Sequence, residues 1–69
     1  MAAFAVGDKV HARDAVQGLE LGVVYEVADV LVRHLFGSDY VTYDLVRADR
    51  LHGAHLAVMN GHLLLEPTA

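Results

Sequence analysis

Turn-forming residues interrupt the chain at short intervals, and this spacing limits the folds that it can adopt. The interruptions fall at Gly7, Gly18, Gly22, Gly37-Ser38-Asp39, Gly53, Asn60-Gly61 and Pro67. They leave five segments of strand length, which is the spacing expected of a small all-β domain. The chain contains no repeat, linker or low-complexity stretch, so residues 1–69 are predicted to form one domain.

Two of these segments alternate between apolar and polar residues, as half-buried strands do. In DKVHAR, Val10 and Ala12 point to one side, whereas Lys9, His11 and Arg13 point to the other. In DYVTYDLVR, one face carries Val41, Tyr43 and Leu45, and the opposite face carries Tyr40, Thr42 and Asp44. We expect the more apolar face of each strand to enter the core.

The segment HLAVMNGHLLLE predicts a closing β-hairpin. Asn60-Gly61 suits a two-residue type I′ turn, because both central residues of that turn need a positive φ. The resulting register pairs Val58 with Leu63 and His55 with Glu66. One hairpin face is expected in the core and consists of Leu56, Val58, Leu63 and Leu65. The other face is too apolar for water, and we predict it as a subunit or partner contact formed by Ala57, Met59, His62 and Leu64.

The middle segment, residues 23–36, fits either a helix or a strand. Apolar residues recur at helical spacing, but the many valines favour a strand because they lose side-chain freedom in a helix. A strand requires the apolar phase to slip from Val27 to Val30, which a β-bulge near Ala28-Asp29 would produce. We favour the strand. The connection ADRLHG, residues 48–53, could hold one short helical turn.

The composition predicts self-association. The chain is 55% hydrophobic and 20% charged, whereas typical globular domains are about 45–50% apolar and about 25% charged. With no cysteine it has no disulfide or thiolate metal site to stabilise it. A domain this small cannot bury so much apolar surface internally, so we expect a homo-oligomer or an apolar contact with a protein partner.

The charge and the N-terminal residues restrict partners and location. The net charge is −4, and the five basic residues are scattered singly, so we do not expect a nucleic-acid partner. The opening MAAFAVGDKV lacks the basic and apolar regions of a signal peptide, and no uncharged run approaches the length of a membrane span. We therefore expect a cytoplasmic protein without a membrane segment.

The stretches FAVGDKVHAR, GLELGVVYEVADV and LAVMNGHLLLEP together resemble small bacterial and phage-encoded SH3-like barrels. The resemblance implies a five-stranded, strongly bent barrel, and it covers most of the chain outside residues 35–53. Similar openings occur in ribosome- and transcription-associated KOW modules. The chain departs from peptide-binding SH3 domains in having no tryptophan, and from RNA-binding KOW modules in being acidic.

The chain carries no sequence motif of an enzyme. His52 and His55 lie three residues apart, and His11, His34 and His62 could join them with Glu66 at a zinc or nickel site. We favour solvent-facing histidines instead, with His55 opposite Glu66 as a cross-strand charge pair. The one serine, Ser38, lies in a turn, so we expect no serine nucleophile, no metal and no cofactor.

Tyr25, Tyr40 and Tyr43 could line a shallow site for a planar ligand, although half-buried core tyrosines are the favoured interpretation. The glycines of GLELGVVYEV are interpreted as a tight corner before a strand, with Leu19 and Leu21 anchoring it, rather than as a phosphate loop. The expected function is a non-enzymatic module for protein–protein contact. The alternatives are a nucleic-acid-associated KOW-like barrel and an oligomer that binds a small ligand or metal at its interface.

Overall fold

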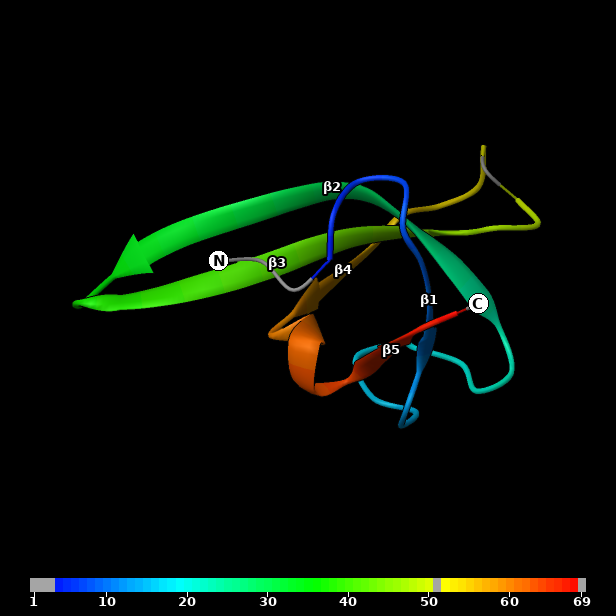
Figure 1. The fold of residues 1–69 in the computed structure, drawn as a ribbon, viewed down its shortest axis with the longest axis horizontal. Helices are drawn as coiled ribbons and strands as arrows, with labels where there is room; N and C mark the ends of the chain where they lie inside the picture. The colour runs from blue at the N-terminus through cyan, green and yellow to red at the C-terminus, as the bar shows by residue number, and fades with distance from the viewer. Residues whose placement is uncertain (1–3, 51, 69) are drawn as a thin grey trace.

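Across residues 4–50 and 52–68, the computed structural model forms five antiparallel strands in one sheet, with almost no helix (Figure 1). The strand order is β4-β3-β2-β1-β5. The element bounds are β1 Lys9–Ala12, β2 Val24–Leu35, β3 Ser38–Arg47, β4 Leu56–Met59, the 3₁₀ helix η1 Gly61–Leu63, and β5 Leu65–Pro67. The predicted all-β class is confirmed, and the arrangement is consistent with a small barrel-like fold.

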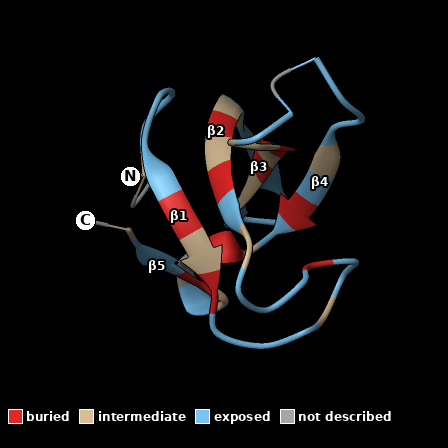
Figure 2. Cartoon of the chain, turned by 90° about the vertical axis from the view of Figure 1, so that its right-hand side faces the viewer, coloured by how far each residue is buried: buried red, intermediate tan, exposed pale blue. Residues whose placement is uncertain are grey.

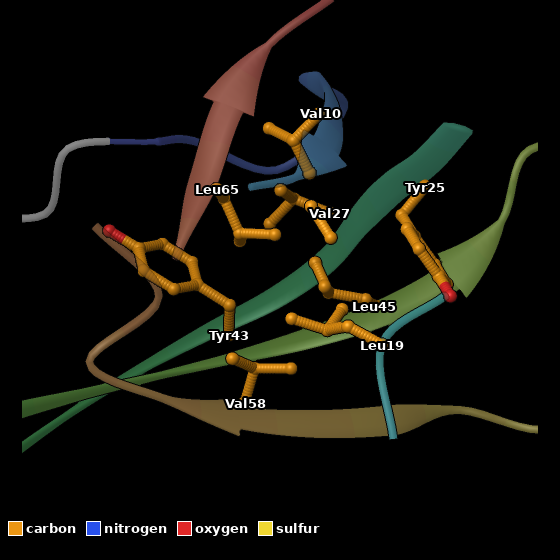
Figure 3. Close-up of a cluster of buried hydrophobic side chains, with 9 residues drawn as sticks. Val10, Leu19, Tyr25, Val27, Tyr43, Leu45, Val58 and Leu65 are labelled. Atoms are coloured by element: carbon orange, nitrogen blue, oxygen red, sulfur yellow. The ribbon is translucent and has the colours of Figure 1, made fainter. Parts of the chain in front are cut away.

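The core contains the side chains that the apolar–polar alternation of β1 and β3 predicts to face inward. Val10 and Ala12 of β1 are buried, as are Tyr43 and Leu45 of β3. Buried positions alternate with more exposed ones along β1 and β2 (Figure 2). The core cluster, most of which is labelled in Figure 3, consists of Val10, Ala12, Leu19, Tyr25, Val27, Tyr43, Leu45, Val58 and Leu65.

The middle segment is a strand with a bulge, as predicted. Tyr25 and Val27 of β2 are buried, and the pairing with β3 slips between Val27 and Asp29. After the slip, Val30 is the next residue of β2 that packs against the core. The extra residue in the strand therefore restores the apolar phase that the valine spacing required.

The predicted hairpin around Asn60-Gly61 is wrong. Asn60 has the expected positive φ of 56°, but Gly61 begins η1, in which the Leu63 N–H donates to the Asn60 carbonyl at 3.0 Å. Strand β4 pairs with β3 and β5 pairs with β1, so β4 and β5 do not pair with each other. The reason is tertiary: a Cβ on Gly61 would lie 2.6 Å from Cδ2 of Tyr43, so this glycine permits close packing on a core ring.

The 3₁₀ turn also reverses the predicted positions of two leucines. Leu63, which was expected in the core, is 66% exposed, and Leu64, which was expected on the outer face, packs against the core. Strand alternation does not continue through η1, because a 3₁₀ helix has three residues per turn.

The two-residue turn with positive φ at both central residues, which was expected at Asn60-Gly61, occurs instead between β2 and β3. Leu35 pairs with Ser38, and the two residues between them, Phe36 and Gly37, both have positive φ (51° and 77°). Beyond the body of the molecule the two strands continue as a projecting hairpin, and the molecule measures 37 × 22 × 21 Å (Figure 1). We call residues 30–41 the arm.

The connection at residues 48–53 forms turns. The Arg50 N–H donates to the Arg47 carbonyl at 2.9 Å, and the Gly53 N–H donates to the Arg50 carbonyl at 2.8 Å. Leu51 lies outside the described residues, and the short helix of the described chain is η1 rather than this connection.

Candidate interaction surface

The arm is built from direct cross-strand pairs and has little of the body against it. Val32 pairs with Val41, and Arg33 pairs with Tyr40. Near the tip, His34 and Asp39 lie opposite each other and form an ion pair when the histidine is protonated. All residues from 31 to 39 are exposed. Each pair from Val30–Tyr43 to Arg33–Tyr40 includes a β-branched or aromatic residue, which favours the pairing of the two strands there.

One face of the arm is apolar although it is exposed. The register places Leu31, Arg33 and Leu35 of β2 on the same side as Thr42 and Tyr40 of β3, with Met59 of β4 beside Thr42. Leu31 is 44%, Leu35 49% and Met59 52% exposed. Beside Leu31, this side has a hollow of about 220 Å³, which is lined by Arg33, Leu35, Phe36, Tyr40, Thr42 and Met59. We call this side, Leu31 included, the arm face.

The apolar area of the arm face is large for so small a protein. Taking an aromatic side chain as about 150–250 Å² and the aliphatic ones as about half exposed, Leu31, Leu35, Phe36 and Met59 present roughly 500 Å². The largest patch on a typical monomer is about 300–600 Å² and is often functional. A standard interface covers about 800 Å² per partner, of which about 57% is apolar, so the arm face supplies the apolar area that one such contact needs.

Phe36 is the unusual residue of this surface. Its side chain is fully exposed (101%), and its φ of 51° lies in the left-handed region. That conformation costs an ordinary residue about 1–2 kcal/mol, and a bulky residue seldom adopts it. No burial within the chain offsets this cost, and strain of this kind clusters at functional positions. The fold alone does not explain an aromatic residue here.

The four residues predicted as an interaction surface do not share one face, because their hairpin does not form. Ala57 and Met59 lie exposed on β4, and Leu64 turns inward. The side chain of His62 lies outside the described part of the structure. Of the three whose side chains the structure describes, Met59 belongs to the arm face. Phe36 was missed because Phe-Gly is not a typical type I′ sequence, whereas Asn-Gly is.

His11, His34 and His55 each pair with a separate carboxylate. His11 Nε2 lies 3.0 Å from Glu66 Oε2, and His55 Nδ1 lies 2.6 Å from Asp44 Oδ2. The predicted His55–Glu66 pair is therefore wrong. Among the described side chains, no three His, Asp or Glu residues come close enough to hold a metal ion.

The glycine corner is held by one leucine and one ion-pair cluster. Gly18 and Gly22 both have positive φ, and Leu19 is buried, whereas Leu21 is 60% exposed and does not anchor the loop as predicted. Arg47 binds Glu20 and Asp49, each at 3.1 Å. The hydrogen bond from Arg47 holds the pKa of Asp49 below its usual range.

A second hollow, of about 420 Å³, lies beside this ion-pair cluster. It is lined by Gly22, Val23, Val24, Arg47, Ala48 and Asp49. The charged groups in its wall, Arg47 and Asp49, already bind each other. Because these two side chains already bind within the chain, they offer little free hydrogen-bonding capacity to a ligand in the hollow.

Two of the three tyrosines belong to the core. Tyr25 and Tyr43 are buried, and the hydroxyl oxygen of Tyr25 accepts the Glu20 N–H at 3.0 Å. Tyr43 also forms an edge-to-face contact with Phe4, with ring centroids 5.6 Å apart. The third, Tyr40, lies on the arm face and lines the hollow there. The structure therefore does not bring the three tyrosines into one site.

No family model, curated protein or solved structure matches the chain. Within the described residues, no helix is long and apolar enough to cross a membrane.

Proposed function

We propose that the chain is a non-enzymatic interaction module and that its arm face is the contact surface for protein. The observation that carries the proposal is Phe36: a fully exposed aromatic side chain, in a strained backbone conformation, at the tip of a projecting hairpin. Aromatic anchors in apolar surroundings supply much of the binding energy at protein interfaces. The surrounding Leu31, Leu35 and Met59 supply the apolar area.

The resemblance to SH3-like barrels forms part of the proposal, supported by the five-stranded antiparallel sheet and the glycine corner at Gly18 and Gly22. The KOW-like alternative has less support. Lys9, Arg13 and Arg47 each lie in an ion pair with a carboxylate of the same chain, so few cations face solvent without a partner. A phosphate backbone requires a cluster of such cations.

The test places a photo-reactive phenylalanine analogue at position 36 in cells that express the chain. Light should join the chain to protein, and the product could be a second copy or another protein. The same analogue at Leu21, which is 60% exposed and lies outside the arm in the loop between β1 and β2, is the matched control. Equal crosslinking at both positions, or none at position 36, would contradict the proposal. Salt-dependent binding of labelled RNA or DNA would favour the KOW-like alternative instead.

A further inference from the structure

The outer edge of β2 is open along the arm. Strand β1 pairs with β2 only from Val24 to Glu26, and the last described hydrogen bonds to this edge join Val27 to Gly7 and Asp8. From Ala28 to Leu35, no described strand lies on that side of β2. An open edge of this length presents unpaired backbone groups that can accept another strand.

The other sheet edges are shorter or covered. Strand β5 has three residues. The edge of β4 is capped by Gln17, whose amide donates to the Met59 carbonyl at 3.0 Å and accepts the Met59 N–H at 3.1 Å. Short and capped edges resist strand addition, so β2 offers the best place for it.

Two charged residues along this edge form no ion pair within the described part of the chain. Asp29 and Arg33 are exposed and form no ion pair with any described residue. Across the sheet, Asp29 faces another carboxylate, Asp44, which is a destabilising arrangement. Arg33 faces Tyr40. Both charges would be stabilised by opposite charges supplied from outside.

The sequence around these charges is complementary to itself. The segment DVLVR, residues 29–33, has Leu31 at its centre. When two copies run antiparallel about a twofold axis at Leu31, Asp29 faces Arg33 of the other copy and Val30 faces Val32 of the other copy. Leu31 then faces its own equivalent. Within residues 29–33, every opposed pair is either apolar or of opposite charge, which is the pairing that stabilises neighbouring strands.

We infer that the chain forms a symmetric dimer in which the β2 edges of two copies pair antiparallel about Leu31. The inference rests on the proposed function, because it names a second copy as the protein that contacts the arm. The contact is isologous, so each copy contributes the same residues and the assembly closes at two. Paired in this way, the two arms form one continuous sheet, with their apolar faces next to each other on the same side of it.

The body of the chain limits how far the incoming strand can extend. At Val27 the β2 edge is occupied by Gly7 and Asp8, so the incoming strand must end there. Pairing about Leu31 uses residues 28–34 of both copies, so it stops short of the occupied position. The arm tip of one copy then lies next to the turn at residues 5–8 of the other, where Val6 is exposed.

Sedimentation equilibrium of the purified chain, from micromolar to millimolar concentration, tests the inference. The mass should rise from 7.5 kDa toward twice that value. Asp29→Arg or Arg33→Asp alone should weaken the dimer by at least about tenfold, because each puts like charges opposite each other at two symmetric positions. The double variant Asp29→Arg/Arg33→Asp restores opposite charges and should return the dissociation constant to within about threefold of the original.

Asp14→Arg is the matched control, since Asp14 is also an exposed carboxylate that accepts the N–H of the next residue at 2.8 Å. It lies outside the arm and should leave the dimer unchanged. Circular dichroism of each variant verifies that the fold is intact.

A monomer at every concentration would overturn the dimer, yet crosslinks from position 36 to another protein would still support the proposed function. If the original chain dimerises but Asp29→Arg/Arg33→Asp does not recover its dissociation constant, the antiparallel pairing about Leu31 would be overturned. Stronger association of Asp29→Arg would show that Asp29 protects the edge, and would overturn the inference as well.

Discussion

Replacing Phe36 by Asn should stabilise the isolated fold although it removes a large apolar side chain. Phe36 is fully exposed, so the substitution loses no burial. Its φ of 51° costs an ordinary residue about 1–2 kcal/mol, whereas Asn tolerates this region well and Asn-Gly is a preferred type I′ pair. We expect the free energy of unfolding to rise by about 1 kcal/mol, which for a domain of this size raises Tm by about 4–8 °C.

The assay is urea and thermal unfolding followed by circular dichroism, at a concentration where sedimentation shows both proteins to be monomeric. This condition matters because a dimer would add its own stability to the original chain. Gly37→Ala is the control and should change stability in the opposite direction. The φ of Gly37 is 77° and a Cβ there would meet nothing within 4 Å, so backbone strain alone should lower the free energy of unfolding by about 1 kcal/mol. A loss of stability in Phe36→Asn would refute the reasoning, because it would show that the ring packs within the chain.

Three further predictions concern the body of the fold. Gly61→Ala should lower the free energy of unfolding by at least about 2 kcal/mol in urea titrations, because its Cβ would lie 2.6 Å from the buried ring of Tyr43; an unchanged value would show that the ring can move. Leu65→Ala should lower the free energy of unfolding by about 2–5 kcal/mol and Leu63→Ala by less than about 0.5 kcal/mol, because only Leu65 of the two is buried. Equal losses would instead support a hairpin between β4 and β5, in which both leucines are buried. The Asp49 carboxyl, followed by NMR, should titrate below 3.8, and Arg47→Gln should raise its midpoint. Because the pKa of Asp49 is lowered in the folded state, the Arg47–Asp49 pair stabilises the fold at pH values above the pKa of Asp49 in the unfolded chain, and this stabilisation is lost as the pH falls through the folded pKa. A titration midpoint that Arg47→Gln does not change would contradict Arg47 as the cause of the shift.

The strands could be predicted because burial on one face leaves a period-two signal in the sequence. Val10 and Ala12 in β1, and Tyr43 and Leu45 in β3, are inward-facing residues separated by outward-facing ones. The same argument located the bulge, since Val27 and Val30 cannot both face inward on a regular strand.

The turn at Asn60-Gly61 could not be predicted from local preference alone. Asn60 does adopt a positive φ, but Gly61 is selected by the ring of Tyr43, a residue distant in the sequence. The pairing of β4 with β3 instead of β5 follows from such contacts. Leu63 and Leu64 were consequently assigned to the wrong sides.

The arm face was missed for a different reason. Apolar residues at strand spacing, such as Leu31 and Val32, predict a buried strand, and nothing local distinguishes a strand that projects into solvent. The composition did indicate that apolar surface exceeds what so small a core can bury, but it could not place that surface.

Amide hydrogen exchange of the unmodified chain at two concentrations tests the central claim, that the arm is the contact surface, most directly. Exchange at residues 28–36 should slow as the concentration rises, because contact protects the backbone of β2 along the arm. Amides of β5 and of the corner at Gly18 and Gly22 should not change. Protection that rises at those places while the arm remains unchanged would contradict the claim.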